Sequence, residues 1–251
     1  MLGLPDHITA CLFDLDGVLT KTAKVHAAAW TEMFNDFLRS RAERTGGPFA
    51  PPFSPEDYNS YVDGRPRADG VRTFLASRGI ELAEGTPDDP PEVETVHGLG
   101  NRKNEILLNL IRSHGVEVYE GSVRYLRAAR DAGLRRAVVS ASANCRAVLR
   151  AAGIEDLLEV RVDGLVAAAE GLRGKPYPDT FLTASRLLGV PAQNGAVFED
   201  STAGVQAGRD GGFGFVVGVD RFGDNHSSRH ADDLKAHGAS IVVHDLAELM
   251  T

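Results

Sequence analysis

Short apolar runs alternate with helical patterns over much of this chain. Five runs predict buried strands, at residues 10–13, 137–139, 196–198, 215–217 and 241–243. Apolar residues at helical spacing predict helices near the later strands, over residues 123–132, 145–152, 180–188 and 203–210. Strands that alternate with helices in this way are typical of βαβ units and a parallel sheet.

A block of helical patterns separates the first predicted strand from the others. Over residues 27–41, Trp30, Phe34 and Phe37 share one face of a predicted helix, and residues 103–112 repeat such spacing. Ser54 followed by Pro55 and two acids is a helix-start signature, and residues 84–92 form a loop rich in Pro and Gly. We therefore interpret the block as an all-helical insertion into an α/β core.

Composition and charge exclude several classes of protein. The 251 residues are 43% hydrophobic and 25% charged, with a net charge of −8 and no basic cluster, which argues against nucleic-acid and anionic-membrane partners. No apolar run approaches the ~20 residues that cross a bilayer, and the first residues lack the pattern of a signal peptide. With only Cys11 and Cys145, a disulfide is possible but not favoured, and we expect a cytoplasmic location. A monomer is the default expectation.

Polar residues follow the predicted strands at positions where a parallel sheet binds ligands. The first strand leads into Asp14 and Asp16, and others lead into Ser140 and the pair Glu199-Asp200, while Lys175 precedes the helix at 180–188. Two carboxylates after an apolar strand repel each other and lose hydration. A divalent cation and a lysine at the same edge would neutralise them.

This set of side chains suits phosphoryl transfer. Oxygen ligands from Asp14, Glu199 and Asp200, with the main-chain carbonyl of Asp16, match the preferences of Mg²⁺. A carboxylate can attack phosphorus to give an aspartyl phosphate, while the ion and Lys175 offset the negative charge. Ser140 and nearby backbone N–H groups, including that of Ala141, can hold the phosphoryl oxygens. Asp16 would then serve as general acid and base.

Four segments, DLDGVLT, VVSASAN, GKPYPD and FEDSTAGVQA, resemble in order the four motifs of the haloacid dehalogenase (HAD) superfamily. The resemblance implies a doubly wound, Rossmann-like parallel sheet with a helical cap inserted after the first motif. We assign residues 1–21 and 114–251 to the catalytic core and residues 22–113 to the cap. The resemblance also implies Mg²⁺, Asp14 as nucleophile and Asp16 as acid and base.

Within that superfamily, TAKVHAAAW, DGRPRADGV, NRKNE and SASAN resemble the β-phosphoglucomutase-like subfamily. The resemblance implies that Thr22 and His26 lie by the cap hinge. It also implies that the substrate's phosphate is engaged from the cap by the segments of Gly64, Arg67 and Lys103, and from the serine loop by Asn144. The implied activity interconverts β-glucose 1-phosphate and glucose 6-phosphate through a bisphosphate.

Three positions depart from the subfamily pattern. Lys21 stands where an Asp is common, Asp63 replaces a common Lys, and Ala143 replaces a Lys that usually grips the non-transferring phosphate. Arg67, Lys103 or Arg146 could substitute for that missing cation. Two alternatives therefore stay open, a phosphatase of a small sugar phosphate and a non-catalytic sugar-phosphate sensor.

Overall fold

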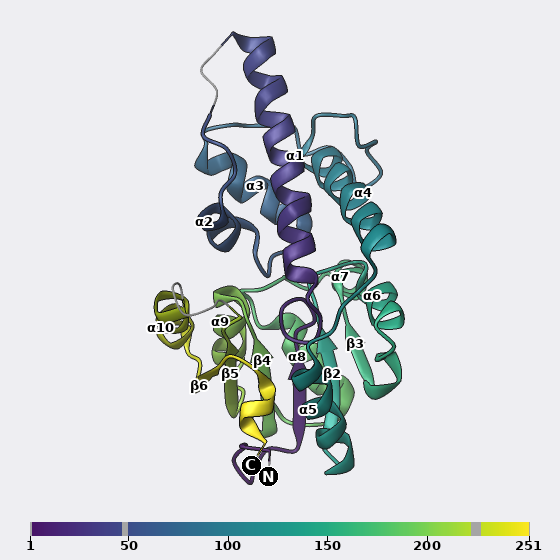
Figure 1. Cartoon of the computed structure of the whole chain (residues 1–251), viewed down its shortest axis with the longest axis vertical. Helices are drawn as coiled ribbons and strands as arrows, with labels where there is room; N and C mark the ends of the chain where they lie inside the picture. The colour runs from purple at the N-terminus through teal and green to yellow at the C-terminus, as the bar shows by residue number, and fades with distance from the viewer. Residues whose placement is uncertain (1, 47–49, 222–226, 251) are drawn as a thin grey trace. The chain divides into compact units, whose positions relative to one another are not determined.

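The computed structural model describes residues 2–46, 50–221 and 227–250, and the chain divides into two compact units (Figure 1). Residues Met1–Lys21 and Val116–Thr251 form the first unit, and residues Thr22–Gly115 form the second. The second unit is entirely helical in the part that the structure describes, whereas the first contains the sheet. None of the described helices is long and apolar enough to cross a membrane.

The sheet has six parallel strands in the order β3-β2-β1-β4-β5-β6. They are β1 (Ala10–Phe13), β2 (Arg135–Val139), β3 (Val160–Val162), β4 (Gly195–Glu199), β5 (Phe215–Val219) and β6 (Ile241–Val243). Phe13 pairs with Val138 on one side and Phe198 on the other, so the carboxyl ends of three strands are level. The chain winds away from β1 in both directions, which confirms the predicted doubly wound fold.

One strand, β3, was not predicted. Its sequence is Val160-Arg161-Val162, and the single charged residue breaks the short apolar run that marks the other strands. Only Val162 is fully buried, since β3 is the edge strand next to β2. Three residues with one ion-paired arginine carry too little pattern for a prediction from sequence.

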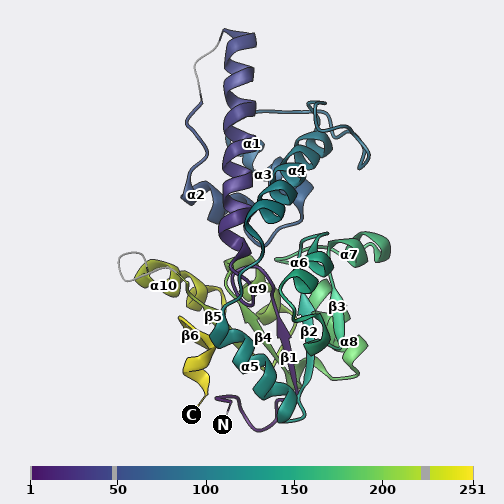
Figure 2. The same ribbon diagram turned by 45° about the vertical axis from the view of Figure 1, so that its right-hand side comes forward.

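Helices cover both faces of the sheet (Figures 1 and 2). Helices α8 (Asp179–Leu188), α9 (Thr202–Asp210) and α10 (Ser227–His237) pack on one face, where Phe181, Val205 and Leu234 join a core with Leu12 and Val139. Helix α5 (Glu120–Asp131) covers the other face, where Tyr125 lies against Phe13 and Phe198. The short helices α6 (Cys145–Ala151) and α7 (Gly164–Glu170) and the 3₁₀ turns η2 (Glu155–Leu157), η3 (Ala192–Asn194) and η4 (Leu246–Leu249) complete the unit.

The second unit is built on two long helices, α1 (Thr22–Thr45) and α4 (Val96–His114), which pack against each other. Helix α2 (Pro55–Asp57), the π-helical turn η1 (Tyr58–Val62) and α3 (Arg67–Ser77) lie between them in sequence. The predicted stripe of Trp30, Phe34 and Phe37 is the centre of the unit's own apolar core. Ser54 caps α2 as predicted, because its hydroxyl accepts from the Asp57 N–H.

Candidate active site

A tight loop follows β1 and fixes the direction of the first two acids. The Asp14 N–H donates to the Phe198 carbonyl at 2.9 Å, which continues the sheet by one residue, and the Thr20 N–H turns back to the Leu15 carbonyl at 2.9 Å. Gly17 has φ +90°, and a Cβ there would overlap the Asp200 carboxylate. Only glycine allows this turn to pass so close to the acid that follows β4.

Lys175 is the central residue of the candidate site and has three hydrogen-bond partners. Its ammonium donates to Asp14 Oδ1 at 2.5 Å, to the Val139 carbonyl at 3.1 Å and to the Glu199 carboxylate, and only 3% of the residue is exposed. Burial alone would lower the pKa of Lys175, but attraction by Asp14 and Glu199 outweighs burial and raises it. The lysine is therefore a permanent cation that links the carboxyl ends of β2, β1 and β4.

Glu199 and Asp200 reach the site at the junction of β4 and α9. Glu199 Oε2 accepts from the Ser201 N–H at 3.0 Å and from its hydroxyl at 2.9 Å. Ser201 also caps α9, because its hydroxyl accepts from the Gly204 N–H at 3.1 Å. A Cβ at Gly204 would overlap the Glu199 carboxylate. Sequence reasoning missed Ser201, although an acid-acid-serine run directly before a helix is a signal for it.

Three carboxylates can hold a hard divalent cation. One oxygen from each of Asp14, Glu199 and Asp200 lies within 4.8 Å of the others. Burial raises the pKa of Asp14 well above its ordinary value; Lys175 opposes the shift, and repulsion from Glu199 and Asp16 adds to it. Three carboxylates with one ammonium leave an excess of two negative charges, which a dication would balance. Coordination by the Asp16 carbonyl stays a prediction.

The loop after β2 brings Ser140 to Asp16. The Ser140 hydroxyl donates to Asp16 Oδ2 at 3.4 Å and accepts from the Ser142 N–H at 3.1 Å. Asn144 precedes α6 without capping it through its side chain, and its N–H donates to Ser142 Oγ at 3.1 Å. Ala141 is partly exposed. The structure thus brings Ser140 and Asp16 together at the edge where Asp14 and Lys175 lie.

Arg146 and Lys21, singled out by departures from the subfamily pattern, have other partners in the first unit. Arg146 donates to Glu155 at 2.8 Å on the surface, so it is a weaker substitute for the missing cation at Ala143 than the sequence indicates. Lys21 donates to Glu117 at 2.8 Å. This pair joins the two segments that enter and leave the unit.

The two thiols are not nucleophiles. Both cysteines are free and buried. Burial raises the pKa of Cys11 to about 12 and also raises that of Cys145. A thiol that stays protonated at neutral pH is inert in nucleophilic catalysis.

In the second unit, the structure brings His26 and Lys103 together. The Lys103 ammonium lies 3.1 Å from His26 Nδ1 and 4.9 Å from the centre of the Trp30 ring. An ammonium can only donate, so Nδ1 accepts and the imidazole carries its hydrogen on Nε2. Lys103 is 4% exposed. Thr22, the first residue of α1, is also buried.

Arg67 begins α3, three residues after Gly64, which has φ +68°. Its Nη2 donates to Asn101 Oδ1 at 3.2 Å, and among the residues that the structure describes Arg67 has no carboxylate partner. Burial lowers the pKa of Arg67, because no carboxylate of the described residues lies beside it to offset the loss of hydration. A half-buried guanidinium with a neutral partner is suited to receive an anion.

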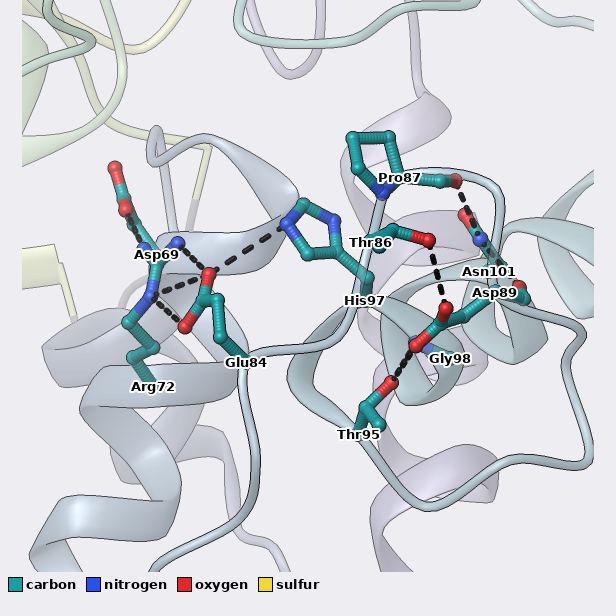
Figure 3. A network of polar contacts seen from close by, with 10 residues as sticks. All are labelled: Asp69, Arg72, Glu84, Thr86, Pro87, Asp89, Thr95, His97, Gly98 and Asn101. Atoms are coloured by element: carbon teal, nitrogen blue, oxygen red, sulfur yellow. Dashed lines mark hydrogen bonds and ion pairs between the residues drawn. The ribbon is translucent and has the colours of Figure 1, made fainter.

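Asn101 connects Arg67 to the loop at residues 84–95, a connection that sequence reasoning missed. Figure 3 shows the loop side of this connection, where Asn101 contacts Pro87. Its amide donates to the carbonyls of Pro87 at 3.0 Å and Asp89 at 2.8 Å. Asp89 in turn accepts from the hydroxyls of Thr86 and Thr95, at 2.8 and 2.6 Å. The loop is therefore closed on itself by polar contacts and presents two carbonyls that orient Asn101.

Acidic residues and a lysine lie at the carboxyl edge of a parallel sheet, at the point from which the chain winds in both directions. This arrangement defines a class, the α/β enzymes with an acidic site at that edge. Residues 8–212 match the sequence profile of haloacid dehalogenase-like hydrolases. The chain belongs to this family, as its four motifs predict.

Individual relatives agree with this assignment. The chain is 54% identical over 250 residues to a β-phosphoglucomutase of Mycobacterium tuberculosis, covering 100% of this chain and 94% of the relative. A β-phosphoglucomutase of Bacillus subtilis is 31% identical over 84% of this chain and 82% of its own length. The crystal structure of a Clostridium difficile β-phosphoglucomutase superposes with a TM-score of 0.72 at 26% identity, over 96% of this chain and 93% of that one. The predicted similarity to this subfamily is confirmed.

Proposed function

We propose that the protein is a β-phosphoglucomutase, which interconverts β-glucose 1-phosphate and glucose 6-phosphate through a bisphosphate. The observation that carries the proposal is the 54% identity to a mycobacterial β-phosphoglucomutase over the whole of this chain. The arrangement of Asp14, Asp16 and Lys175 at one sheet edge supports the same chemistry. We expect a cytoplasmic monomer that acts on a small sugar phosphate.

In the first half of the proposed reaction, Asp14 Oδ attacks the phosphorus of a bound phosphate ester and becomes an aspartyl phosphate. Lys175 holds the Asp14 carboxylate in place by a charge-assisted hydrogen bond. Asp14, Glu199, Asp200 and the Asp16 carbonyl would hold Mg²⁺. When bound there, Mg²⁺ supplies positive charge that offsets the repulsion between the anionic nucleophile and the anionic substrate.

Asp16 is proposed to move the proton. It would donate to the leaving oxygen as the ester bond breaks and later accept a proton from the sugar hydroxyl that attacks the phosphorylated Asp14. The contact with Ser140 holds the carboxyl of Asp16 near the serine loop. The same loop, with the N–H of Ala141 and the side chain of Asn144, is proposed to bind phosphoryl oxygens.

The second unit is proposed to be the cap, over residues 22–113. Arg67 and Lys103 would bind the phosphate that is not transferred, and the cationic character of both side chains supports this role. Thr22 and His26, at the start of α1, would lie by the hinge, and Gly64 gives the turn that leads to Arg67. Closing this cap would exclude water while Asp14 carries the phosphoryl group.

A phosphatase of a small sugar phosphate is the second candidate. It shares the first half-reaction and uses water as the acceptor, and Ala143 favours it because a cation for the second phosphate is missing there. A sensor without catalysis is less consistent with the site. It would have no use for the buried set of Asp14, Lys175 and Glu199, which is costly to bury and suited to reaction.

One assay separates these functions. The protein is given Mg²⁺, β-glucose 1-phosphate and a trace of the bisphosphate, and glucose 6-phosphate is compared with free phosphate. Predominant glucose 6-phosphate is expected, whereas mainly inorganic phosphate would establish the phosphatase. Asp14→Asn is the control, because both enzymatic functions lose turnover in this variant and a sensor keeps its response to ligand.

A further inference from the structure

Arg221, two residues beyond β5, uses every hydrogen-bond donor of its side chain. Nε donates to the Gly17 carbonyl at 3.0 Å. Nη2 donates to the Val18 carbonyl at 3.0 Å and to Ser122 Oγ at 2.7 Å. Nη1 donates to the His244 carbonyl at 2.6 Å and to Asp245 Oδ2 at 2.9 Å. A guanidinium has five N–H groups, so its bonding capacity is filled.

Two of these acceptors belong to the loop that carries Asp16. Gly17 and Val18 follow Asp16 directly, and their carbonyls point to one guanidinium. The loop is also held by bonds within itself, such as the Gly17 N–H to the Thr20 carbonyl at 2.8 Å, and by the Ser140 hydroxyl on Asp16. Arg221 thus ties the carbonyls of Gly17 and Val18 to the segment that directly follows β5, on the other side of β4 from β1.

Arg221 also lies beside the two segments through which the chain enters and leaves the first unit. Its guanidinium stacks on Tyr119, 3.7 Å from the ring centre. The Tyr119 N–H donates to the Leu19 carbonyl at 3.0 Å, and the Lys21 N–H donates to the Glu117 carbonyl at 2.8 Å. Arg221 therefore contacts three segments: the loop that follows Asp16, the segment at Tyr119, and the turn at His244 and Asp245. Its side chain is 13% exposed.

We propose that Arg221 is a positioning residue that holds Asp16 in place as the general acid and base. The proposal rests on the role assigned to Asp16 above. Fixing two consecutive carbonyls of the loop restricts the peptide planes that follow Asp16, and these planes set where its carboxyl points. Lysine cannot replace this function, since an ammonium has no planar fork to serve both carbonyls, Ser122 and Asp245 together.

A misplaced general acid has a specific kinetic signature. Breaking the bond to a sugar oxygen requires a proton, because an alkoxide is a poor leaving group. Breaking the bond in acetyl phosphate requires none, because acetate leaves readily as an anion. Loss of Arg221 should therefore slow transfer from a sugar phosphate while transfer from acetyl phosphate to Asp14 continues.

The experiment compares the two phosphoryl donors in Arg221→Lys and in the parent protein. Sugar-phosphate consumption is scored as glucose 6-phosphate plus inorganic phosphate, which counts one product per turnover whether the protein is a mutase or a phosphatase. Phosphorylation of Asp14 by acetyl phosphate is followed by intact mass. We expect kcat with the sugar phosphate to fall on the order of 100-fold and the acetyl phosphate rate to change less than about threefold.

Two further variants complete the design. Arg186→Lys, at an exposed position of α8, is the matched control and should change neither rate. Ser122→Ala removes one acceptor and keeps Arg221, so it provides the test if Arg221→Lys fails to fold, with a smaller loss in the same direction. Equal losses with both donors, or no loss with either, would overturn the proposal.

Discussion

Lys175 in the sheet unit is a buried cation and Arg67 in the helical unit a half-buried one, and their charges are matched in opposite ways. In the sheet unit, Lys175 lies between the carboxylates of Asp14 and Glu199, so its positive charge is balanced by acids of the protein itself. In the helical unit, the hydrogen-bond partner of Arg67 is the neutral amide of Asn101. A cation that is paired with the protein's own carboxylates holds those carboxylates in place. A cation beside a neutral amide keeps its charge available for an anionic ligand. The first is expected to matter for stability and chemistry, and the second for binding.

Removing Lys175 should give the largest effect on stability. Lys175→Met leaves Asp14 and Glu199 buried without a counter-charge, and we expect a loss of about 3–5 kcal/mol in the free energy of unfolding. Urea denaturation in the presence of a chelator measures it. A loss below about 1 kcal/mol would show that the lysine does not stabilise the two buried carboxylates.

The corresponding change in the other unit is Arg67→Met. The free energy of unfolding should stay within about 1 kcal/mol of the parent, because no buried carboxylate is left behind. The proposed role in binding instead predicts a KM for the sugar phosphate that rises roughly tenfold to a hundredfold, the equivalent of about 1.5–3 kcal/mol for a charged hydrogen bond. Steady-state kinetics would detect it, and an unchanged KM would remove Arg67 from the binding site.

The pKa of Lys175 predicts how stability depends on pH. Burial lowers this pKa, but Asp14 and Glu199 raise it further, so the folded value exceeds the ordinary 10.5. The stabilisation is therefore complete below pH 10.5 and is lost as the pH rises through the folded pKa. Denaturation between neutral pH and pH 12 should show a decline of up to about 1.4 kcal/mol per pH unit from this group. Lys175→Met should lack that component, and Arg67→Met should retain it.

The smallest expected effect comes from giving Arg67 a carboxylate partner, as Lys175 has. Asn101→Asp places an anion where Arg67 now bonds an amide, and we expect the KM for the sugar phosphate to rise a few-fold, about 0.5–1 kcal/mol. Asn101→Leu is the matched control, because it also loses the donors to Pro87 and Asp89 but adds no charge. Equal KM values in the two variants would mean that the loop, and not the charge, determines binding.

The sheet edge was predictable because its residues lie in sequence next to the strands that position them. Asp14, Ser140 and Asp200 each follow a strand directly, and a buried apolar run is visible in the sequence. No strand ends beside Lys175, which was predicted from its place in the loop before the helix at 180–188. The helical insertion was visible from the stripe around Trp30 and from the capping signal at Ser54.

Other features depend on contacts that no local pattern encodes. Arg221 resembles any surface arginine in sequence, and its role depends on Gly17 and Ser122, which are about 200 and 100 residues away along the chain. Asn101 is one polar residue on a helix, and its importance comes from a loop that precedes it. Long-range polar contacts of this kind follow from the fold and are not marked by periodicity.

Gly204 has a consequence for anyone who engineers this protein. Within a helix, alanine is normally favoured over glycine by about 1 kcal/mol, so a design that maximises helix propensity would replace it. Here the added methyl group would occupy the space of the Glu199 carboxylate and displace an acid that bonds Lys175. A more stable α9 would thus disturb the proposed reaction centre, and we expect a routine thermostabilising substitution here to inactivate the protein.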